Sequence, residues 1–129
     1  MLETIVVAYD DPESATLERA ADLAELVGAE LIVTNVAVSV QDESTDDAAG
    51  NARDRLEQAR RFLADRALSA ELVPSVGAPA EAIVRLAEER GADLIVVGTR
   101  HKRFLERLVE GSVLQEVLRR AKCDVLVVS

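Results

Sequence analysis

The chain has 129 residues, of which 49% are hydrophobic and 30% charged, which suits one folded domain over residues 1–129 and excludes a disordered chain. The formal net charge of −9 would repel nucleic acid and an anionic membrane, so we expect neither as a partner. The single cysteine, Cys123, excludes an internal disulfide and favours a reducing compartment.

The sequence predicts a cytoplasmic protein. No apolar run approaches the roughly 20 residues that cross a bilayer, and the first strand pattern begins at Thr4, too early for a signal peptide. Lys102 and Lys122 are the only lysines beside thirteen arginines. This acidic, lysine-poor composition favours a halophile with a salt-rich cytoplasm; the alternative is an acidic protein from a GC-rich genome.

The first half of the chain alternates between strand and helix patterns. Ile5–Ala8 is an apolar run ended by turn residues, which predicts a buried strand. From Ser14, apolar residues recur at helical spacing up to Gly28, a residue typical of a helix C-terminus. Leu31–Val38 predicts the second strand, and the polar stretch Ser39–Asn51 predicts a solvated surface loop.

The middle of the chain continues this alternation. An amphipathic helix around Leu56 follows the loop. Leu72–Val73 predicts a weak third strand broken by Pro74, and such a strand belongs at a sheet edge because proline cannot donate to the ladder. Pro79 is typical of a first helical turn, and the helix that it opens is expected to end before Gly91.

The last third completes the pattern. Leu94–Val97 predicts a fourth strand that stops at Gly98. A basic linker over Thr99–Glu110 leads into a helix over Ser112–Ala121, and Asp124–Ser129 predicts a fifth strand. Strict alternation with fully apolar strands predicts an α/β fold, a doubly wound five-stranded parallel sheet with helices on both faces.

Ligands of such sheets bind beyond the carboxyl ends of the strands, where the winding reverses. Asp10 and Asp11 follow the first strand at this edge, and Gly98 follows the fourth. Gly111 and Ser112 open the last helix, whose N-terminus attracts phosphate through unpaired N–H groups and the helix dipole. These positions predict an anion site.

The linker before that helix is basic although the chain is acidic. Arg100, Lys102 and Arg103 gather positive charge that favours an anion-attracting linker, and the alternative is a solvated loop whose arginines pair with neighbouring acids. His101 lies among them as a candidate ligand contact or a plain surface residue. Ser112 is expected to cap the helix whether or not it meets phosphate.

Enzyme chemistry finds little support in the sequence. Asp10 and Asp11 resemble the acidic pair of receiver domains, but Pro74–Gly77 supplies no phosphoacceptor aspartate. No Gly-Lys-Ser/Thr phosphate loop is present, which disfavours a fast ATPase. One histidine and one cysteine disfavour a catalytic triad or a metal cluster, so we expect no catalytic or metal site and an apolar role for Cys123.

The order of the glycines carries a family resemblance. Gly98-Thr99-Arg100-His101, nine further residues and Gly111-Ser112-Val113 resemble the nucleotide-binding signature of the universal stress protein family. That signature reads Gly, two residues, Gly, nine residues, Gly, then Ser or Thr. The resemblance covers the whole chain and includes Asp10, Gly77-Ala78-Pro79, the run from Gly91 to Gly98 and the closing run from Cys123 to Val128.

The resemblance implies a strand order of 3-2-1-4-5, a homodimer through the final strand (Val125–Val128), and binding of ATP, or AMP, with Mg²⁺. It also implies roles for individual residues. Asp10 and Val36 would lie near the adenosine, Val97 and Gly98 would flank it, and Gly111, Ser112 and Val113 would meet the phosphates or the ribose.

Two positions depart from the family pattern. His101 stands where the signature has its second glycine, and Asp124 stands where relatives commonly have proline. Two functions therefore remain open. The first is a dimeric sensor or regulator that binds an adenine nucleotide and hydrolyses it slowly, if at all. The second is a stress protein without nucleotide that acts through dimerisation and protein partners.

Overall fold

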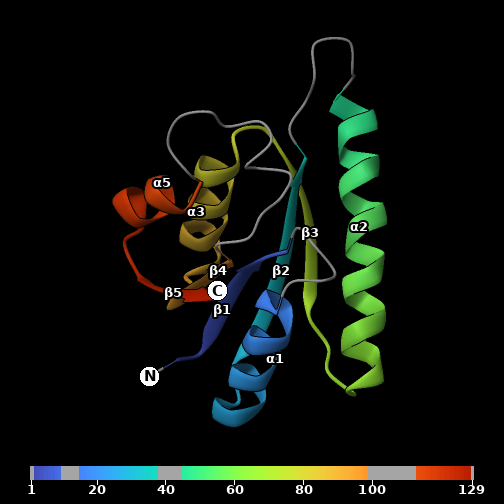
Figure 1. Ribbon diagram of the computed structural model, residues 1–129, viewed down its shortest axis with the longest axis vertical. Coiled ribbons are helices and arrows are strands. Elements are labelled where there is room, and N and C mark those ends of the chain that lie inside the picture. Colours follow the sequence, from blue (N-terminus) through green and yellow to red (C-terminus); the bar gives the residue numbers. More distant parts are fainter. Residues whose placement is uncertain (1, 10–14, 38–44, 99–112, 129) are drawn as a thin grey trace.

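The computed structural model describes residues 2–9, 15–37, 45–98 and 113–128 (Figure 1). Strands and helices alternate along these ranges. The strands are β1 (Thr4–Ala8), β2 (Glu30–Ala37), β3 (Glu71–Val76), β4 (Leu94–Gly98) and β5 (Asp124–Val128). The helices are α1 (Thr16–Val27), α2 (Thr45–Asp65), α3 (Pro79–Arg90) and α5 (Val113–Arg120).

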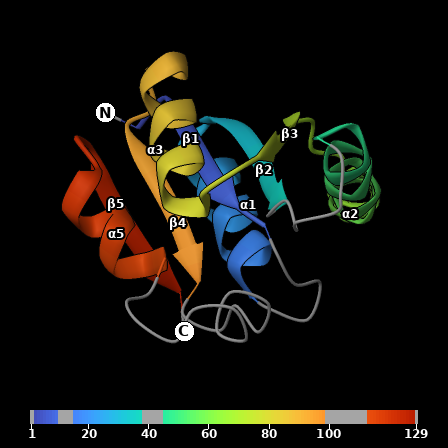
Figure 2. The same ribbon diagram turned by 90° about the horizontal axis from the view of Figure 1, so that it is seen from above.

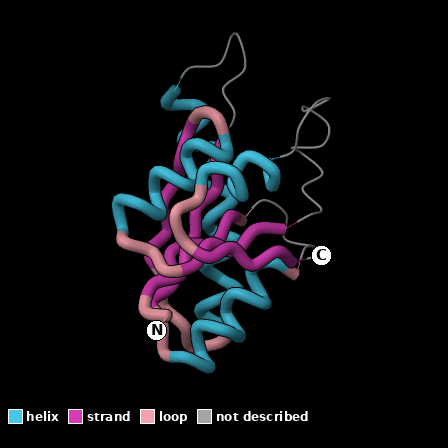
Figure 3. The backbone as a smooth tube through the Cα atoms, turned by 90° about the vertical axis from the view of Figure 1, so that its left-hand side faces the viewer, coloured by secondary structure: helices cyan, strands magenta, loops and turns pink. Residues whose placement is uncertain are grey.

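The five strands form one parallel sheet in the order β3-β2-β1-β4-β5. This confirms the predicted doubly wound fold. After β1 the chain winds outward to β2 and β3, then crosses back to β4 on the other side of β1. The winding therefore reverses between β1 and β4. The tube drawing shows the strands between helices that lie on both sides of them (Figure 3).

Helices cover both faces of the sheet because the strand residues alternate between two cores (Figure 2). Ile5 and Val7 pack with α1 and α2, whereas Val6 packs with α3 and α5. Alanines such as Ala20 and Ala59 are fully buried on the helices, which lets the helix backbones approach the sheet in a chain with 2% aromatics.

The predicted helix ends are confirmed at two glycines. Gly28 and Gly91 follow α1 and α3 with φ angles of 70° and 63°. A left-handed residue at this position is favourable for glycine, which has no Cβ to clash with the preceding turn. Within the described ranges, no helix combines the length and the apolar character that a bilayer crossing needs.

The predicted loop over Ser39–Asn51 is wrong in its second half, because α2 begins at Thr45. Ala52, which the loop prediction placed at the edge of the helix, is fully buried and packs against Ala37 and Val76 at the ends of β2 and β3. The polar composition suggested a connector, but a tertiary contact of one small residue, together with the high helix propensity of alanine, extends the helix.

The predicted break of the third strand at Pro74 is also wrong, although its place at the sheet edge is confirmed. β3 runs through Pro74, which pairs in register with Asn35. Gly77 donates its N–H to the Ala37 carbonyl of β2, and peptide groups alternate in direction along a strand. The Pro74 nitrogen therefore faces the open side of β3, where no ladder donor is needed.

Candidate functional site at the carboxyl edge of the sheet

The central strand β1 ends earlier than its two neighbours. Its register with β2 ends at the pair Ala8–Thr34, and its register with β4 ends at Val7–Val96. β2 continues to Ala37 and β4 continues to Gly98. The carboxyl edge therefore has a step at β1, at the reversal of the winding where ligands of such sheets bind.

Four of the predicted site residues are described, and the fold brings them to this edge. Val36, Val97 and Val113 come from β2, β4 and α5, and all three are buried in one apolar cluster on the α3 and α5 side of the sheet. Gly98 follows Val97, is buried, and is paired in register with Val128. Segments far apart in sequence thus meet at the carboxyl edge of the sheet.

The other predicted site residues lie outside the described residues, and their roles stay predictions. They are Asp10 after β1, His101, Gly111 and Ser112 of the signature, and Arg100, Lys102 and Arg103 of the basic linker. Asp10 directly follows Tyr9 in the chain, and Ser112 directly precedes Val113.

A buried amide at the end of β1 escaped sequence reasoning. The Tyr9 N–H donates to the Thr34 carbonyl at 2.8 Å, and the Asn35 Nδ2 donates to the Tyr9 carbonyl at 2.7 Å. Asn35 is fully buried, and its Oδ1 has no hydrogen-bond partner among the residues that the structure describes. The signal that could have found it is the Asn next to Thr34 in a strand whose other residues from Leu31 to Ala37 are apolar.

The backbone of Val36 turns toward the step. The Thr34 carbonyl faces β1, where it accepts from Tyr9, and the peptide groups of alternate strand residues point the same way. The N–H and C=O of Val36 therefore also face the β1 side, but the β1–β2 register has already ended at Thr34. A donor and an acceptor thus lie side by side past the end of β1.

A second polar group, also missed from sequence, links β2 to β3. The Thr34 hydroxyl donates to the Val73 carbonyl at 2.7 Å and lies 3.0 Å from the Ser75 hydroxyl. Thr34 is buried, with 1% of its surface exposed. The Thr34 hydroxyl already has hydrogen-bond partners on β3, so its role is to stabilise the β2–β3 pair and not to bind a ligand.

The amino edge carries a cavity of about 780 Å³ lined by residues such as Thr4, Glu30, Glu71 and Arg90. Two of its charged groups are paired, since Arg90 donates from Nε to Glu71 at 2.8 Å and so lowers the pKa of that carboxyl. The hydrogen bonds from the backbone N–H groups of Glu3 and Thr4 to Asp93 lower the pKa of that carboxyl too. This edge therefore holds the strands together and is the weaker site candidate.

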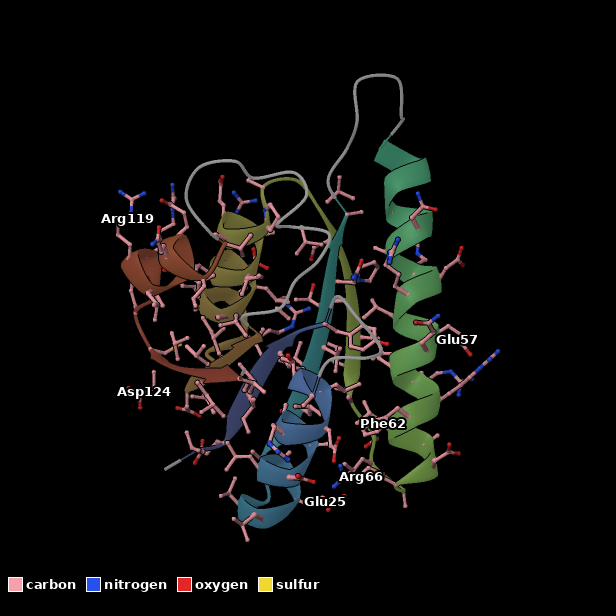
Figure 4. All side chains as sticks on the ribbon, in the orientation of Figure 1. Glu25, Glu57, Phe62, Arg66, Arg119 and Asp124 are labelled. Atoms are coloured by element: carbon pink, nitrogen blue, oxygen red, sulfur yellow. The ribbon has the colours of Figure 1, made fainter. Side chains whose placement is uncertain are left out.

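Another paired group lies at the same end of the molecule, between α1 and α2 (Figure 4). Arg66 follows α2 and contacts Asp22 at 2.8 Å and Glu25 at 3.0 Å on α1, with its guanidinium 5.7 Å from the centre of the Phe62 ring. In the described ranges, no group of three or more His, Cys, Asp or Glu side chains could hold a metal.

Comparison with solved structures supports the fold. A universal stress protein in complex with cAMP is 32% identical with a TM-score of 0.71, over 99% of this chain and 97% of that chain. A protein of Archaeoglobus fulgidus from the same family is 28% identical with a TM-score of 0.78, over 100% of this chain and 95% of that chain.

Sequence comparison identifies the family. The chain is 36% identical to a universal stress protein of Thermus aquaticus over 99% of both chains. It is 54% identical to one of Methanocaldococcus jannaschii over 40% of this chain, a match that spans 31% of that relative's length. The model of the universal stress protein family matches residues 1–129. The chain therefore belongs to the universal stress protein family.

Proposed function

We propose that this chain binds an adenine nucleotide at the step in the carboxyl edge and acts as a dimeric regulator. The observation that carries the proposal is the peptide group of Val36, which faces the β1 side past the end of the β1–β2 register, beside an apolar cluster. The 6-amino group of adenine donates a hydrogen bond and the adjacent ring nitrogen accepts one, a pattern that complements a C=O and an N–H on one strand. The apolar cluster would receive the flat face of the base.

A related protein supports the choice of adenine. The universal stress protein in complex with cAMP shares 32% of its residues with this chain over nearly its full length. For this chain we propose ATP, or AMP, as the ligand. Mg²⁺ would be held chiefly by the phosphates, and the N-terminus of α5 with the preceding Gly111 and Ser112 would face the anion.

We also propose that the protein is a binder and not an enzyme. Fast hydrolysis needs a base or a positioned metal next to the attacking water. The ionisable candidate for such a role is Asp10, which the family resemblance assigns to a contact with the adenosine instead. The expected hydrolysis is therefore slow enough for the bound nucleotide to act as a signal.

Isothermal titration with ATP and AMP, each with and without Mg²⁺, tests the proposal. We expect saturable binding of ATP and AMP, and weaker binding of GTP, whose 6-oxo group presents an acceptor in place of the amino donor. Absence of heat at millimolar ATP would refute the nucleotide site and favour the function through protein partners.

The effect of His101 is tested by His101→Gly, which restores the family signature. If the imidazole obstructs the phosphates, the variant binds ATP more tightly than the wild type while AMP changes less. If the imidazole contacts the phosphates, the variant binds ATP more weakly. Equal affinities would make His101 a surface residue without a role in binding.

Dimerisation is proposed through β5, which forms one edge of the sheet. Leu126 and Val127 on this strand are 38% and 39% exposed, and Leu118 on the neighbouring α5 is 52% exposed. An apolar strand edge invites pairing with a second strand. Sedimentation at micromolar concentration should give a dimer that Leu126→Lys dissociates, and a clean wild-type monomer would refute this interface.

A further inference from the structure

We propose that Asn35 is a positioning residue that keeps the Val36 peptide group available to a nucleobase. The inference rests on the proposed adenine site, because it assigns a role within that site. It concerns the Tyr9 carbonyl, where a side chain replaces the regular ladder between β1 and β2.

A regular parallel ladder would continue by one more bond at this point. Because Tyr9 donates to Thr34, the next bond of the pattern runs from the Val36 N–H to the Tyr9 carbonyl. The register instead ends at Ala8–Thr34, and the Tyr9 carbonyl accepts from Asn35 Nδ2 at 2.7 Å. The side-chain amide takes the place that the backbone N–H of Val36 would fill.

The other end of the Asn35 amide shows that stability alone does not explain this residue. Oδ1 is fully buried, and the described residues offer it no donor. A buried acceptor without a partner is unfavourable, whereas an apolar side chain of similar size would leave no polar atom unsatisfied. Asn35 therefore lowers stability in the free protein, which is understandable if it serves binding.

The consequence is that the Val36 N–H of β2 forms no ladder bond with β1. With the Tyr9 carbonyl occupied by Asn35, Val36 keeps both N–H and C=O for an incoming base. Without Asn35, the Val36 N–H can close onto the Tyr9 carbonyl and extend the β1–β2 ladder by one residue. The strands would then be joined where the base is expected to enter.

The test compares Asn35→Leu with Thr34→Val, a matched control on the adjacent residue. Thr34→Val removes the buried hydroxyl that bonds to Val73 on the β3 side, away from β1. Affinities are measured for AMP and for ribose 5-phosphate, which lacks the base. We expect Asn35→Leu to lose AMP affinity at least tenfold with ribose 5-phosphate unchanged, and Thr34→Val to keep the wild-type ratio of the two affinities.

A direct readout separates positioning from general stabilisation. The scalar coupling across a hydrogen bond between the Val36 nitrogen and the Tyr9 carbonyl carbon, measured by NMR, should be absent in the wild type and present in Asn35→Leu. The thermal midpoint of Asn35→Leu should equal or exceed that of the wild type. A coupling already present in the wild type, or a lower midpoint with an unchanged AMP to ribose 5-phosphate ratio, overturns the proposal.

These experiments also distinguish a failure of the proposed nucleotide binding from a failure of the proposed role of Asn35. If the wild type binds neither AMP nor ATP, the proposed function fails, but the coupling still decides whether Asn35 holds the Val36 N–H off the ladder. If the wild type binds AMP and Asn35→Leu binds it equally well, the proposed function stands and the role of Asn35 is refuted. Should Asn35→Leu not fold, Asn35→Ala provides the same comparison, because it removes the donor to Tyr9 without placing a new polar group in the buried site.

Discussion

The two edges of the sheet handle their backbone and polar groups in opposite ways. At the amino edge, Asp93 accepts from the backbone N–H groups of Glu3 and Thr4, and its own N–H donates to the Thr4 carbonyl at 2.9 Å. At the carboxyl edge, the ladder stops short of Val36, and Asn35 leaves its Oδ1 unpaired among the described residues. Polar groups paired with each other stabilise a fold, whereas groups left open are available to a ligand.

This contrast predicts where substitutions affect stability and where they affect binding. Changes at the amino edge should alter the unfolding free energy without altering nucleotide affinity. Changes at the carboxyl edge should do the reverse. Each of the following experiments tests one side of that contrast, beginning with the largest expected effect.

Proline substitutions in β2 should give the largest difference, because one removes an N–H inside the β1–β2 ladder and the other removes an N–H past its end. Ile32 and Val36 both direct their N–H groups toward β1, but Ile32 is paired in register with Val6 and Val36 lies past the end of the ladder. Ile32→Pro should lose a ladder bond and buried packing, about 2–5 kcal/mol of stability or the fold itself. Val36→Pro loses buried packing but no ladder bond to β1, so it should fold with a smaller loss of stability and lose ATP binding. Chemical denaturation and calorimetric titration measure both; equal destabilisation by the two prolines would break the contrast.

Acid stability should report the Asp93 contacts at the amino edge. Backbone N–H groups of Glu3 and Thr4 hold the pKa of Asp93 below its unfolded value. The ionised carboxylate therefore stabilises the fold above the unfolded pKa of about 3.9, and this stabilisation is lost as the pH falls through the lower folded pKa. Asp93→Asn should lower the thermal midpoint at neutral pH and flatten its fall in acid.

Nucleotide affinity at neutral pH serves as the control for that variant. It should be unchanged, because Asp93 lies at the edge opposite Val36. A variant that lost ATP binding as strongly as stability would show that the two edges are coupled.

Salt should stabilise the protein despite screening its surface ion pairs. Pairs such as Arg66 with Asp22 are partly exposed and contribute little to stability, so their screening by KCl costs little. The net charge of −9 is screened at the same time, which relieves repulsion across the whole surface. We propose that the thermal midpoint rises from dilute buffer to molar KCl; a flat midpoint would remove the halophilic interpretation.

The thiol of Cys123 provides the smallest expected effect. Burial, aided by the nearby carboxylates of Asp124 and Asp93, raises the pKa of this thiol, so little thiolate is present near neutral pH. Alkylation at pH 8 should be slower in the folded protein than in urea. Nucleotide should not change the rate, because Cys123 lies before β5 at the amino edge; protection by ATP would contradict the separation of the two edges.

Much of the fold was predictable because its signals are local. Apolar runs ended by turn residues located the strands, and Gly28 and Gly91 marked the ends of two helices. Pro74 correctly placed β3 at an edge, but the predicted break was wrong because the orientation of one peptide nitrogen depends on register with β2. The early start of α2 at Thr45 was missed because it depends on Ala52 packing against two strands.

The candidate site was predictable only in part. Val36, Val97 and Val113 were expected from the family resemblance, and the structure brings them into one cluster. Asn35 was not expected, because a polar residue in a strand does not reveal from sequence whether it faces solvent, a ligand or a neighbouring carbonyl. Only the pairing of Tyr9 with Thr34 shows that the side-chain amide of Asn35 replaces the Val36 N–H as the donor to the Tyr9 carbonyl.

The amino-acid sequence by itself determined the alternation of strands and helices, the doubly wound class and the edge where a ligand is expected, because hydrophobic periodicity and turn residues act over a few positions. The tertiary structure decided where the β1–β2 ladder ends, which peptide groups stay open, and what Asn35 contacts. Those features depend on the alignment of strands far apart in sequence, and a shift of one residue would reverse every one of them.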